Sequence, residues 1–429
     1  MPVLLKHKRY LKWLPSKKTP SPVVGEGFGV RVILSISPNY FLSVMNKYLV
    51  TIFAVLSLSA CNTGTSTEDP ALSTSTWSWQ LPASFPTPYV PADNPMTAQK
   101  VELGRHLFYD VRLSGNGLQA CGTCHLQEKA FTDGLTVAKG STGELHPRNS
   151  QHLANVVYNT TITWANPALT SLERQMEVPM FGDNPIELGL NDNNKAEVLQ
   201  RFQQDNQYQL LFKQAFPQDP QAINYNNIVK AIASFQRALI SGNSRYDQYN
   251  QQKAQLSDSE LRGKNLFFGE KAECFHCHGS FNLNDQVRHA GTRVIETPFH
   301  NTGLFNIGGT GDFPFPNRGV FELSGQPQDM GKFRASSLRN IAVTAPYMHD
   351  GSIPTLEAVL DFYAAGGRNI TEGVHAGDGR NNPFKGELVT LIDLNEQEKA
   401  DIVAFLKTLT DDEFLHNPQF ANPFLPQNP

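Results

Sequence analysis

The chain has few cysteines, and their arrangement leaves none for a disulfide framework. Only five occur among the 429 residues. Four of them form two patterns of the same kind, Cys121-Gly-Thr-Cys124-His125 and Cys274-Phe-His-Cys277-His278, whereas Cys61 stands alone. If each pair holds a prosthetic group and Cys61 belongs to an export signal, no cysteine remains for a disulfide.

Long charge runs, low-complexity tracts and strand-like alternation are also scarce in the main body of the chain. Hydrophobic residues make up 40% and aromatic residues 10%, which is typical of a globular protein. The 32 glycines and 28 prolines predict many turns and irregular loops. We therefore expect a mainly α fold with long loops, its core partly built around a bulky group, and the length allows two or three domains.

The apolar run at residues 48–58 is too short to span a bilayer comfortably. Met45-Asn-Lys47 gives it a basic start, and Leu58-Ser-Ala-Cys61 follows it. This pattern is typical of a secretory signal peptide, and the cysteine after Leu-Ser-Ala resembles the bacterial lipoprotein processing box. We expect removal of residues 45–60 and a periplasmic protein that is lipid-anchored through Cys61, with a short membrane anchor as the alternative.

The segments on either side of this signal differ in composition. Residues 1–44 are basic without a clear apolar periodicity, so we expect either a start codon assigned too early, with Met45 the true beginning, or a long basic leader. Residues 61–84 are rich in Ser, Thr and Pro, which predicts a tether between the lipid anchor and the folded body.

Removal of the signal changes the charge balance. Residues 1–60 hold eight of the 36 basic and one of the 40 acidic residues, so the remainder carries 28 basic and 39 acidic residues, a net charge of −11. This balance disfavours nucleic-acid binding and more easily accommodates a basic or neutral partner.

Two segments resemble each other and indicate an internal repeat. Val-Glu-Leu-Gly-Arg-His-Leu-Phe-Tyr at residues 101–109 precedes the first cysteine pair, and Leu-Arg-Gly-Lys-Asn-Leu-Phe-Phe at residues 261–268 precedes the second. Both are predicted to be amphipathic helices, and Ser257-Asp-Ser-Glu260 is a candidate capping box for the second. A helix that leads into each cysteine pair favours two tandem domains of one kind, at residues 85–245 and 246–429. Apolar spacing predicts two further helices, at residues 227–240 and 395–409.

Each Cys-x-x-Cys-His motif is typical of covalent haem attachment. The two thiols add across the vinyl groups of one haem, and the adjacent histidine supplies an axial nitrogen to the iron. The alternatives are a zinc knuckle or a thioredoxin-like redox pair. Two such motifs in an exported chain favour haem over both, so we expect two covalently bound c-type haems, on Cys121, Cys124 and His125 and on Cys274, Cys277 and His278.

With these motifs in place, the chain resembles the bacterial di-haem cytochrome c peroxidase and MauG superfamily over about residues 96–410. The resemblance lies in blocks that occur in family order: Glu102-Leu-Gly104, Arg112-Leu-Ser-Gly115, Phe131-Thr-Asp-Gly134, Pro147-Arg-Asn149, Asn184-Pro-Ile-Glu187-Leu-Gly189, Phe299-His-Asn-Thr-Gly303 and the run from Leu338 to Gly351. The run from Met180 to Gly189 and the loop from Lys139 to Gly143 look most like the di-haem enzymes found with methanobactin-type clusters (MbnH-like). The resemblance implies two tandem cytochrome c-like haem domains.

The family assigns the two haems different tasks. The haem on His125 is expected to bind peroxide, and the haem on His278 is expected to relay electrons. In the peroxidases a loop histidine 16 residues after the first ligand can block the first iron, and here Ser141 occupies that position. This departure favours an open first iron, as in the MauG-like branch, although nearby His146 remains an alternative ligand.

The resemblance also implies a distal acid, which moves a proton between the peroxide oxygens as their bond breaks. Glu187 occupies the family position, with Gln175 as a polar neighbour, although the spacing between them exceeds the usual pattern by about two residues. The alternative, which the sequence would favour without the family blocks, is that Glu187 is an ordinary surface or helix-start carboxylate.

The ligand on the far side of the second haem distinguishes the ordinary peroxidases from the MauG-like enzymes. Peroxidases place Met eight residues after the Thr of a Thr-Leu-Glu block, whereas Thr355-Leu-Glu357 here places Tyr363 at that point, as MauG-like enzymes do. A phenolate stabilises high-valent iron, and a thioether favours the reduced metal. The alternative is a core tyrosine, with Met348 as the ligand.

Three further features follow from the family pattern. Trp164 sits where the family has an aromatic bridge between the haems, and a plain core Trp is the alternative. Asn149, Thr344 and Pro346 match an interdomain calcium site, whose hard oxygen ligands suit the ion. His300 and His349 lie in family blocks but are assigned no role.

The resemblance implies an oxidoreductase that uses hydrogen peroxide to form a high-valent di-haem state and to oxidise a partner protein, at Trp in the MbnH-like branch. One alternative is an ordinary cytochrome c peroxidase that takes electrons from a small cytochrome. The other is a di-haem electron carrier with no enzymatic activity, in which both irons would be six-coordinate.

Overall fold

The computed structural model describes residues 77–426. The predicted leader, the signal peptide, Cys61 and most of the tether lie outside the described residues. The helices in chain order are α1 (Ala98–Tyr109), α2 (Cys121–Cys124), α3 (Leu172–Phe181), α4 (Lys195–Gln203), α5 (Asn206–Ala215), α6 (Tyr225–Ala238), α7 (Arg245–Asn250), α8 (Asp258–Phe267), α9 (Phe275–His278), α10 (Phe321–Ser324), α11 (Leu356–Ala364), α12 (Glu396–Lys407) and α13 (Asp412–His416). The strands are β1 (Asn369–Ile370) and β2 (Gly377–Asp378), which pair antiparallel. The predicted mainly α fold with little sheet and long loops is confirmed.

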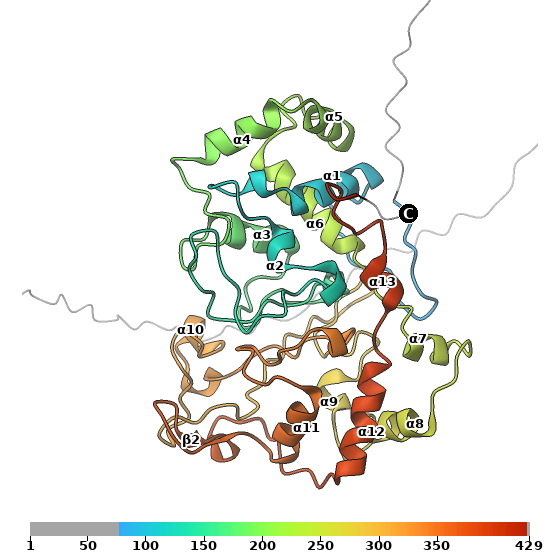
Figure 1. The fold of residues 1–429 in the computed structure, drawn as a ribbon, viewed down its shortest axis with the longest axis vertical. Helices are drawn as coiled ribbons and strands as arrows, with labels where there is room; N and C mark the ends of the chain where they lie inside the picture. Colours follow the sequence, from blue (N-terminus) through green and yellow to red (C-terminus); the bar gives the residue numbers. More distant parts are fainter. Residues whose placement is uncertain (1–76, 427–429) are drawn as a thin grey trace, which may run out of the picture. The chain divides into compact units, whose positions relative to one another are not determined.

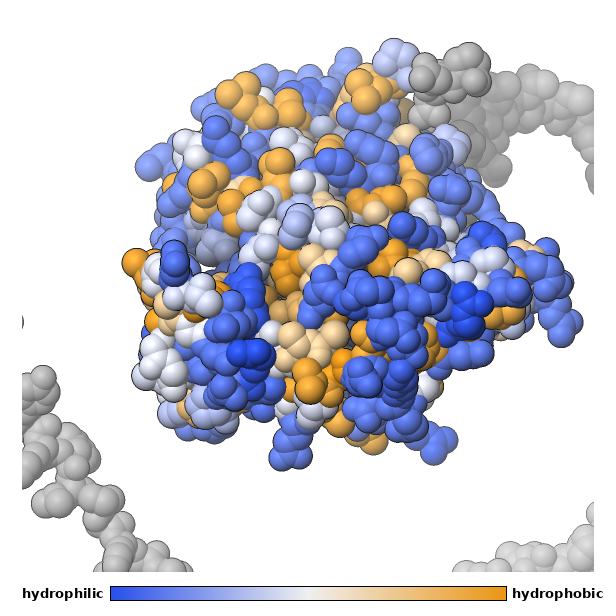
Figure 2. All heavy atoms as spheres, turned by 60° about the horizontal axis from the view of Figure 1, so that its bottom comes forward, coloured by the Kyte–Doolittle hydropathy of each residue, from blue (hydrophilic) through white to orange (hydrophobic). Residues whose placement is uncertain are grey.

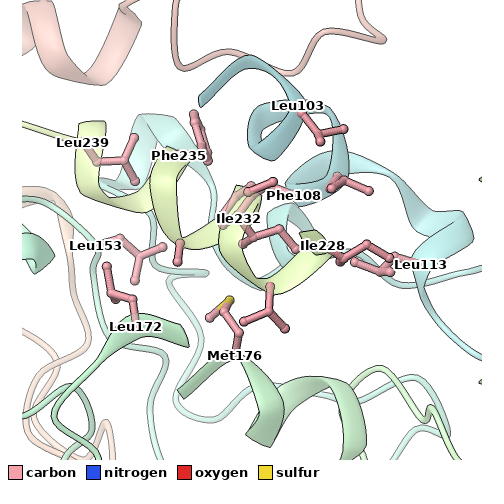
Figure 3. Packing of buried hydrophobic residues seen from close by; sticks show 14 of the residues in the cluster. Leu103, Phe108, Leu113, Leu153, Leu172, Met176, Ile228, Ile232, Phe235 and Leu239 are labelled. Atoms are coloured by element: carbon pink, nitrogen blue, oxygen red, sulfur yellow. The ribbon is translucent and has the colours of Figure 1, made fainter. Parts of the chain in front are cut away.

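The first hydrophobic core forms around α1 and α6. Thr97 caps α1 and Asn224 caps α6, each through a side-chain oxygen that accepts a backbone N–H of the first turn. Figure 3 shows α6 between α1 and α3, with the apolar stripes of these helices turned toward one another. Leu103, Phe108 and Phe235 are fully buried there. The helices predicted at residues 101–109 and 227–240 are thus confirmed, because their apolar spacing creates these faces.

The second core repeats this arrangement around α8 and α12, which lie together in the lower part of Figure 1. The predicted capping box is present, because Ser257 Oγ accepts from Glu260 N and Glu260 Oε2 accepts from Ser257 N. Phe267 of α8 and Phe405 of α12 are fully buried at the contact. The helices predicted at residues 261–268 and 395–409 are confirmed.

A glycine at the same place in each repeat explains why the two motifs share it. A β-carbon on Gly104 of α1 would clash with the carbonyl oxygen of Ala231 in α6. A β-carbon on Gly263 of α8 would clash with the carbonyl oxygen of Asp401 in α12. Each haem motif is therefore preceded by a helix whose backbone approaches its partner helix at a point where only glycine fits.

The C-terminal tail crosses from the second core to the first. Asp411 accepts hydrogen bonds from the backbone N–H groups of Gly242 and Asn243, both at 2.9 Å. Phe414 and Leu415 of α13 are then buried in the first core. The boundary at residues 245/246 stays a prediction, and the tail that we expected with the second domain packs against the first core.

Within residues 77–426, no helix combines the length and apolar character that crossing a membrane requires. Figure 2 shows apolar and polar side chains interspersed on the face of the C-terminal half. Large exposed apolar residues such as Phe315 and Val374 belong to loops. They lie beside a shallow surface cavity of about 690 Å³.

Candidate active site

The first cysteine pair lies on α2, and His125 follows at the end of this helix. The Nδ1 atom of His125 lies 2.6 Å from the carbonyl oxygen of Phe131, to which it donates in the neutral ring. This bond leaves Nε2 without its proton and available to a metal. Burial lowers the pKa of His125, which favours the neutral imidazole that binds iron.

The second motif repeats this geometry on α9. The Nδ1 atom of His278 lies 2.9 Å from the carbonyl oxygen of Leu283. Burial again lowers the pKa of the histidine. The two acceptor residues even share a left-handed backbone, with φ of 67° at Phe131 and 54° at Leu283. The repeat that the sequence indicated therefore extends to the hydrogen bond that orients each histidine.

A cavity of about 300 Å³ lies against the first motif. It brings together most of the side chains that the sequence associated with the first haem. The predicted residues that line it are Cys121, Cys124, His125, His146, Asn149, Trp164, Gln175 and Glu187. Gln175, whose spacing from Glu187 departs from the family pattern, is thus in the same cavity as Glu187.

The walls of this cavity fit a haem. Leu153, Val156 and Ile162 supply apolar surface for a flat macrocycle. Nδ1 of His152 and one terminal nitrogen of Arg334 line the same cavity, are buried, and have no hydrogen-bond partner among the described residues. A haem carries two anionic propionates, so an unpaired buried guanidinium nitrogen is a suitable partner for it.

Glu187 is held against a hairpin formed by residues 138–146. Its carbonyl oxygen accepts from Ser141 N at 2.9 Å, and the preceding Ile186 N donates to Glu144 Oε2 at 3.0 Å. Oε1 of the Glu187 carboxylate lies 3.6 Å from Nε2 of His146. Both residues are among the predicted site residues, but the contact between them was not predicted.

Tyr363 lies on α11, whose N-terminus is capped by Thr355. Its ring packs against the second core, and its hydroxyl makes no hydrogen bond to a described residue. Burial raises the pKa of Tyr363, and the nearby Cys277 and Cys274 raise it further. The predicted far ligand therefore lies close to the second cysteine pair. Met348, the alternative, packs against the same core with φ of 71°.

Trp164 touches both halves of the described chain. Its indole lines the cavity at the first motif and also packs against the second core. Nε1 donates to the carbonyl oxygen of Asn149 at 2.8 Å, which fixes the ring.

The predicted calcium ligands lie on neighbouring segments. Asn149 N donates to the carbonyl oxygen of His349 at 2.9 Å, which brings Asn149 beside the loop that carries Thr344 and Pro346. No described residue donates a hydrogen bond to Oδ1 of Asn149 or to the carbonyl oxygens of Thr344 and Pro346. Three oxygens without donors are compatible with a hard cation.

Arg334 and His152 were not predicted from the sequence. Neither belongs to a local motif, and both gain their place only through the fold. His300, which was assigned no role, lies 2.5 Å from Asp285 Oδ2 through its Nε2 atom, and Cys277 is close to both. His349, also without a role, stacks on Phe333 with ring centroids 3.6 Å apart.

The fold and the two histidine sites define the class, a c-type cytochrome with two haem-binding motifs on a mainly helical scaffold. Comparison with known proteins narrows this class. Residues 98–255 match the family model described as di-haem cytochrome c peroxidase, and residues 332–364 match a RoxA-like, cytochrome c-like model.

Among characterised relatives, the cytochrome-c peroxidase IdrP1 of Pseudomonas sp. (strain SCT) is 34% identical, covering 78% of this chain and 87% of the relative. The methylamine utilization protein MauG of Methylorubrum extorquens is 32% identical, covering 77% and 83%. The crystal structure of a MauG-like protein associated with microbial copper homeostasis is similar with a TM-score of 0.81 and 57% identity, covering 81% of this chain and all of that one.

The chain belongs to the di-haem cytochrome c peroxidase and MauG family. It is therefore an oxidoreductase of that family, and the family implies two c-type haems, hydrogen peroxide as a substrate and a protein as electron donor.

Proposed function

We propose that this protein uses hydrogen peroxide to oxidise a tryptophan of a partner protein. The observation that carries the proposal is Tyr363, a partly buried phenol beside Cys274 and Cys277 with no hydrogen-bond partner among the described residues. It stands where the ordinary peroxidases of the family place a methionine. The similarity to a MauG-like protein associated with copper homeostasis supports the proposed oxidation of a partner protein. We further propose that this partner takes part in copper homeostasis.

The residues for two haems are Cys121, Cys124 and His125 at the first site and Cys274, Cys277 and His278 at the second. Haem iron on His125 would supply the redox chemistry of peroxide cleavage. Glu187, on the wall of the same cavity, would take a proton from one peroxide oxygen and return it to the other. Gln175 would orient the bound oxygens through its amide.

Tyr363 would contribute negative charge to the second site. A phenolate ligand stabilises an oxidised metal centre more than a thioether does, because it is a hard anionic donor. Trp164 contacts both the first cavity and the second core. We propose that it carries charge between the two sites. The protein substrate would then lose electrons at the surface and would not need to enter the cavity.

Two further parts of the proposal concern the whole chain. A calcium ion bound by Asn149, Thr344 and Pro346 would hold the segment 147–152 against the loop 344–349. Residues 45–60 would act as a signal peptide, and Cys61 would anchor the protein to a membrane in the periplasm.

An ordinary peroxidase that draws electrons from a small cytochrome is the second candidate, favoured by the 34% identity to IdrP1. A di-haem electron carrier is the third.

The test is to incubate periplasmic extract of the source organism with the purified protein, with and without peroxide, and to map oxygen additions on tryptophan by mass spectrometry. A tryptophan oxidised only when protein and peroxide are both present, and not with Tyr363→Met, is the expected result. Rapid oxidation of a reduced small cytochrome with no modified tryptophan would assign the protein to the ordinary peroxidases.

A further inference from the structure

The hairpin at residues 138–146 occupies the place where ordinary peroxidases carry a loop histidine that blocks the first iron. Backbone contacts fix it to the segment that carries Glu187. Ser141 N donates to the carbonyl oxygen of Glu187. From a different segment, Asn116 Nδ2 donates to the carbonyl oxygen of Ser141 at 2.7 Å and also holds the hairpin. A β-carbon on Gly140 would clash with the carbonyl oxygen of Ile186, so the two backbones are in direct contact.

His146 lies at the base of this hairpin, and its ring has a defined orientation. Its backbone N donates to the carbonyl oxygen of Ala138 at 2.8 Å, which closes the hairpin. Its Nδ1 accepts the backbone N–H of Arg148 at 3.2 Å. Because Nδ1 is an acceptor, the proton of the neutral ring is on Nε2.

That Nε2 atom is the one that faces Glu187. It lies 3.6 Å from Oε1, which is within ion-pair reach and longer than a hydrogen bond. Catalytic contacts are often this long in the resting protein and shorten when substrate binds. The side chains are 30% and 36% exposed, and both line the cavity of the first motif, so the pair stands at the cavity wall, open to solvent and substrate.

We propose that His146 is a positioning residue that holds the Glu187 carboxylate in the orientation needed to move a proton between the peroxide oxygens, and that it is not an iron ligand. The inference rests on the proposed role of Glu187. It also gives the fixed hairpin a function, because the contacts that fix residues 138–146 to the Glu187 segment set the geometry of the pair.

The experiment uses the purified holoprotein and variants at both positions. His146→Ala should slow the reaction with peroxide about tenfold in stopped-flow spectroscopy, and His146→Gln, which keeps an N–H donor, should restore most of the rate. The double variant His146→Ala/Glu187→Gln should be no slower than Glu187→Gln alone, because His146 acts through Glu187. Ser141→Ala is the matched control and should leave the rate unchanged, since the Ser141 hydroxyl makes no hydrogen bond to a described residue.

Two readouts are independent of turnover. The EPR spectrum of ferric His146→Ala should match that of the wild type, because no iron ligand is lost. Cyanide, which arrives as HCN and must give up a proton, should bind about tenfold more weakly to both His146→Ala and Glu187→Gln.

A change of spin state in His146→Ala would identify an iron ligand and overturn the inference. So would an unchanged peroxide rate in that variant, or additive effects in the double variant. If Glu187→Gln itself reacts normally with peroxide, the proposed acid fails and the inference fails with it. A slow Glu187→Gln beside a normal His146→Ala leaves the proposed function intact and rejects His146 alone.

Discussion

At the scale of single residues, the first cavity is lined in part by buried polar atoms that no described residue pairs with. Arg334 and His152 each keep a buried nitrogen without a partner among the described residues. A buried polar group without a partner costs about 1–3 kcal/mol. Such a position is tolerated when a bound group completes it, and a haem propionate would suit the unpaired Arg334 nitrogen.

Glu187→Gln tests the acid directly. The variant should slow the reaction with peroxide by about 10²-fold or more, because an amide cannot exchange the proton. Stopped-flow spectroscopy of the ferric protein measures the rate. Glu144→Gln is the matched control, since Glu144 lies in the adjoining hairpin and uses one oxygen to accept from Ile186 N, which an amide oxygen can also do. Equal rates for the two variants would exclude Glu187 as the acid.

At the scale of elements, each haem motif depends on one helix crossing. Gly104→Ala and Gly263→Ala should each destabilise the protein by about 1–3 kcal/mol, because an added methyl group must push two helix backbones apart. Urea unfolding of the holoprotein measures the effect. Asn265→Ala, on the exposed side of α8, is the control and should leave stability nearly unchanged. No loss in either glycine variant would mean that the helices are not in backbone contact.

The crossing of α8 and α12 also predicts a pH dependence. The hydrogen bond from Arg262 lowers the pKa of Asp401 to about 2, from an ordinary 3.8. A carboxyl whose pKa is lowered in the folded state stabilises it above its unfolded pKa, and the contribution is lost as the pH falls from about 4 to 2.

Asp401→Asn should therefore be less stable than the wild type at pH 6, with the difference shrinking as the pH approaches about 2. Thermal unfolding across this range measures it. Asp192→Asn is the control, because Asp192 also pairs with a basic residue, Lys195, but its side chain is 91% exposed and such pairs contribute little. A constant difference between Asp401→Asn and the wild type at every pH would contradict the account.

The elements also show what could be predicted from the sequence. Helices α1, α6, α8 and α12 could be predicted, because the apolar spacing and the capping residues that define them are local in the chain. The histidine motifs are local for the same reason, since two cysteines must span one haem edge. The meeting of His146 with Glu187 could not be predicted, because it depends on how a hairpin packs against a segment 41 residues away. The tail provides another example, since nothing in the sequence near Phe414 indicates that the first core buries it.

At the scale of the whole molecule, the proposed calcium site joins segments that are nearly two hundred residues apart. Removing calcium with a chelator should lower the midpoint of thermal unfolding and slow electron transfer between the haems, because the segment that holds Asn149 also orients Trp164. Addition of Ca²⁺ should reverse both effects, and Mg²⁺ should not, since its smaller octahedral shell does not suit these ligands. Asn149→Ala should behave as the chelated protein does. If a chelator changes neither the unfolding midpoint nor the rate of electron transfer, the proposed calcium site is wrong.

The whole molecule also sets the relation between the two sites. Trp164 contacts the first cavity and the second core, and α13 of the C-terminal tail packs against the first core. The two haem motifs therefore lie in one packed unit, in which the proposed transfer of charge between the two sites would take place.

The central claim is that the first iron is open on its distal side while Tyr363 ligates the second. EPR of the purified ferric holoprotein tests it most directly, because a coordination difference appears as a difference in spin state. The account predicts one high-spin and one low-spin haem, with only the low-spin signal altered in Tyr363→Met. Two low-spin haems in the resting protein, or a low-spin signal that Tyr363→Met leaves unchanged, would contradict it.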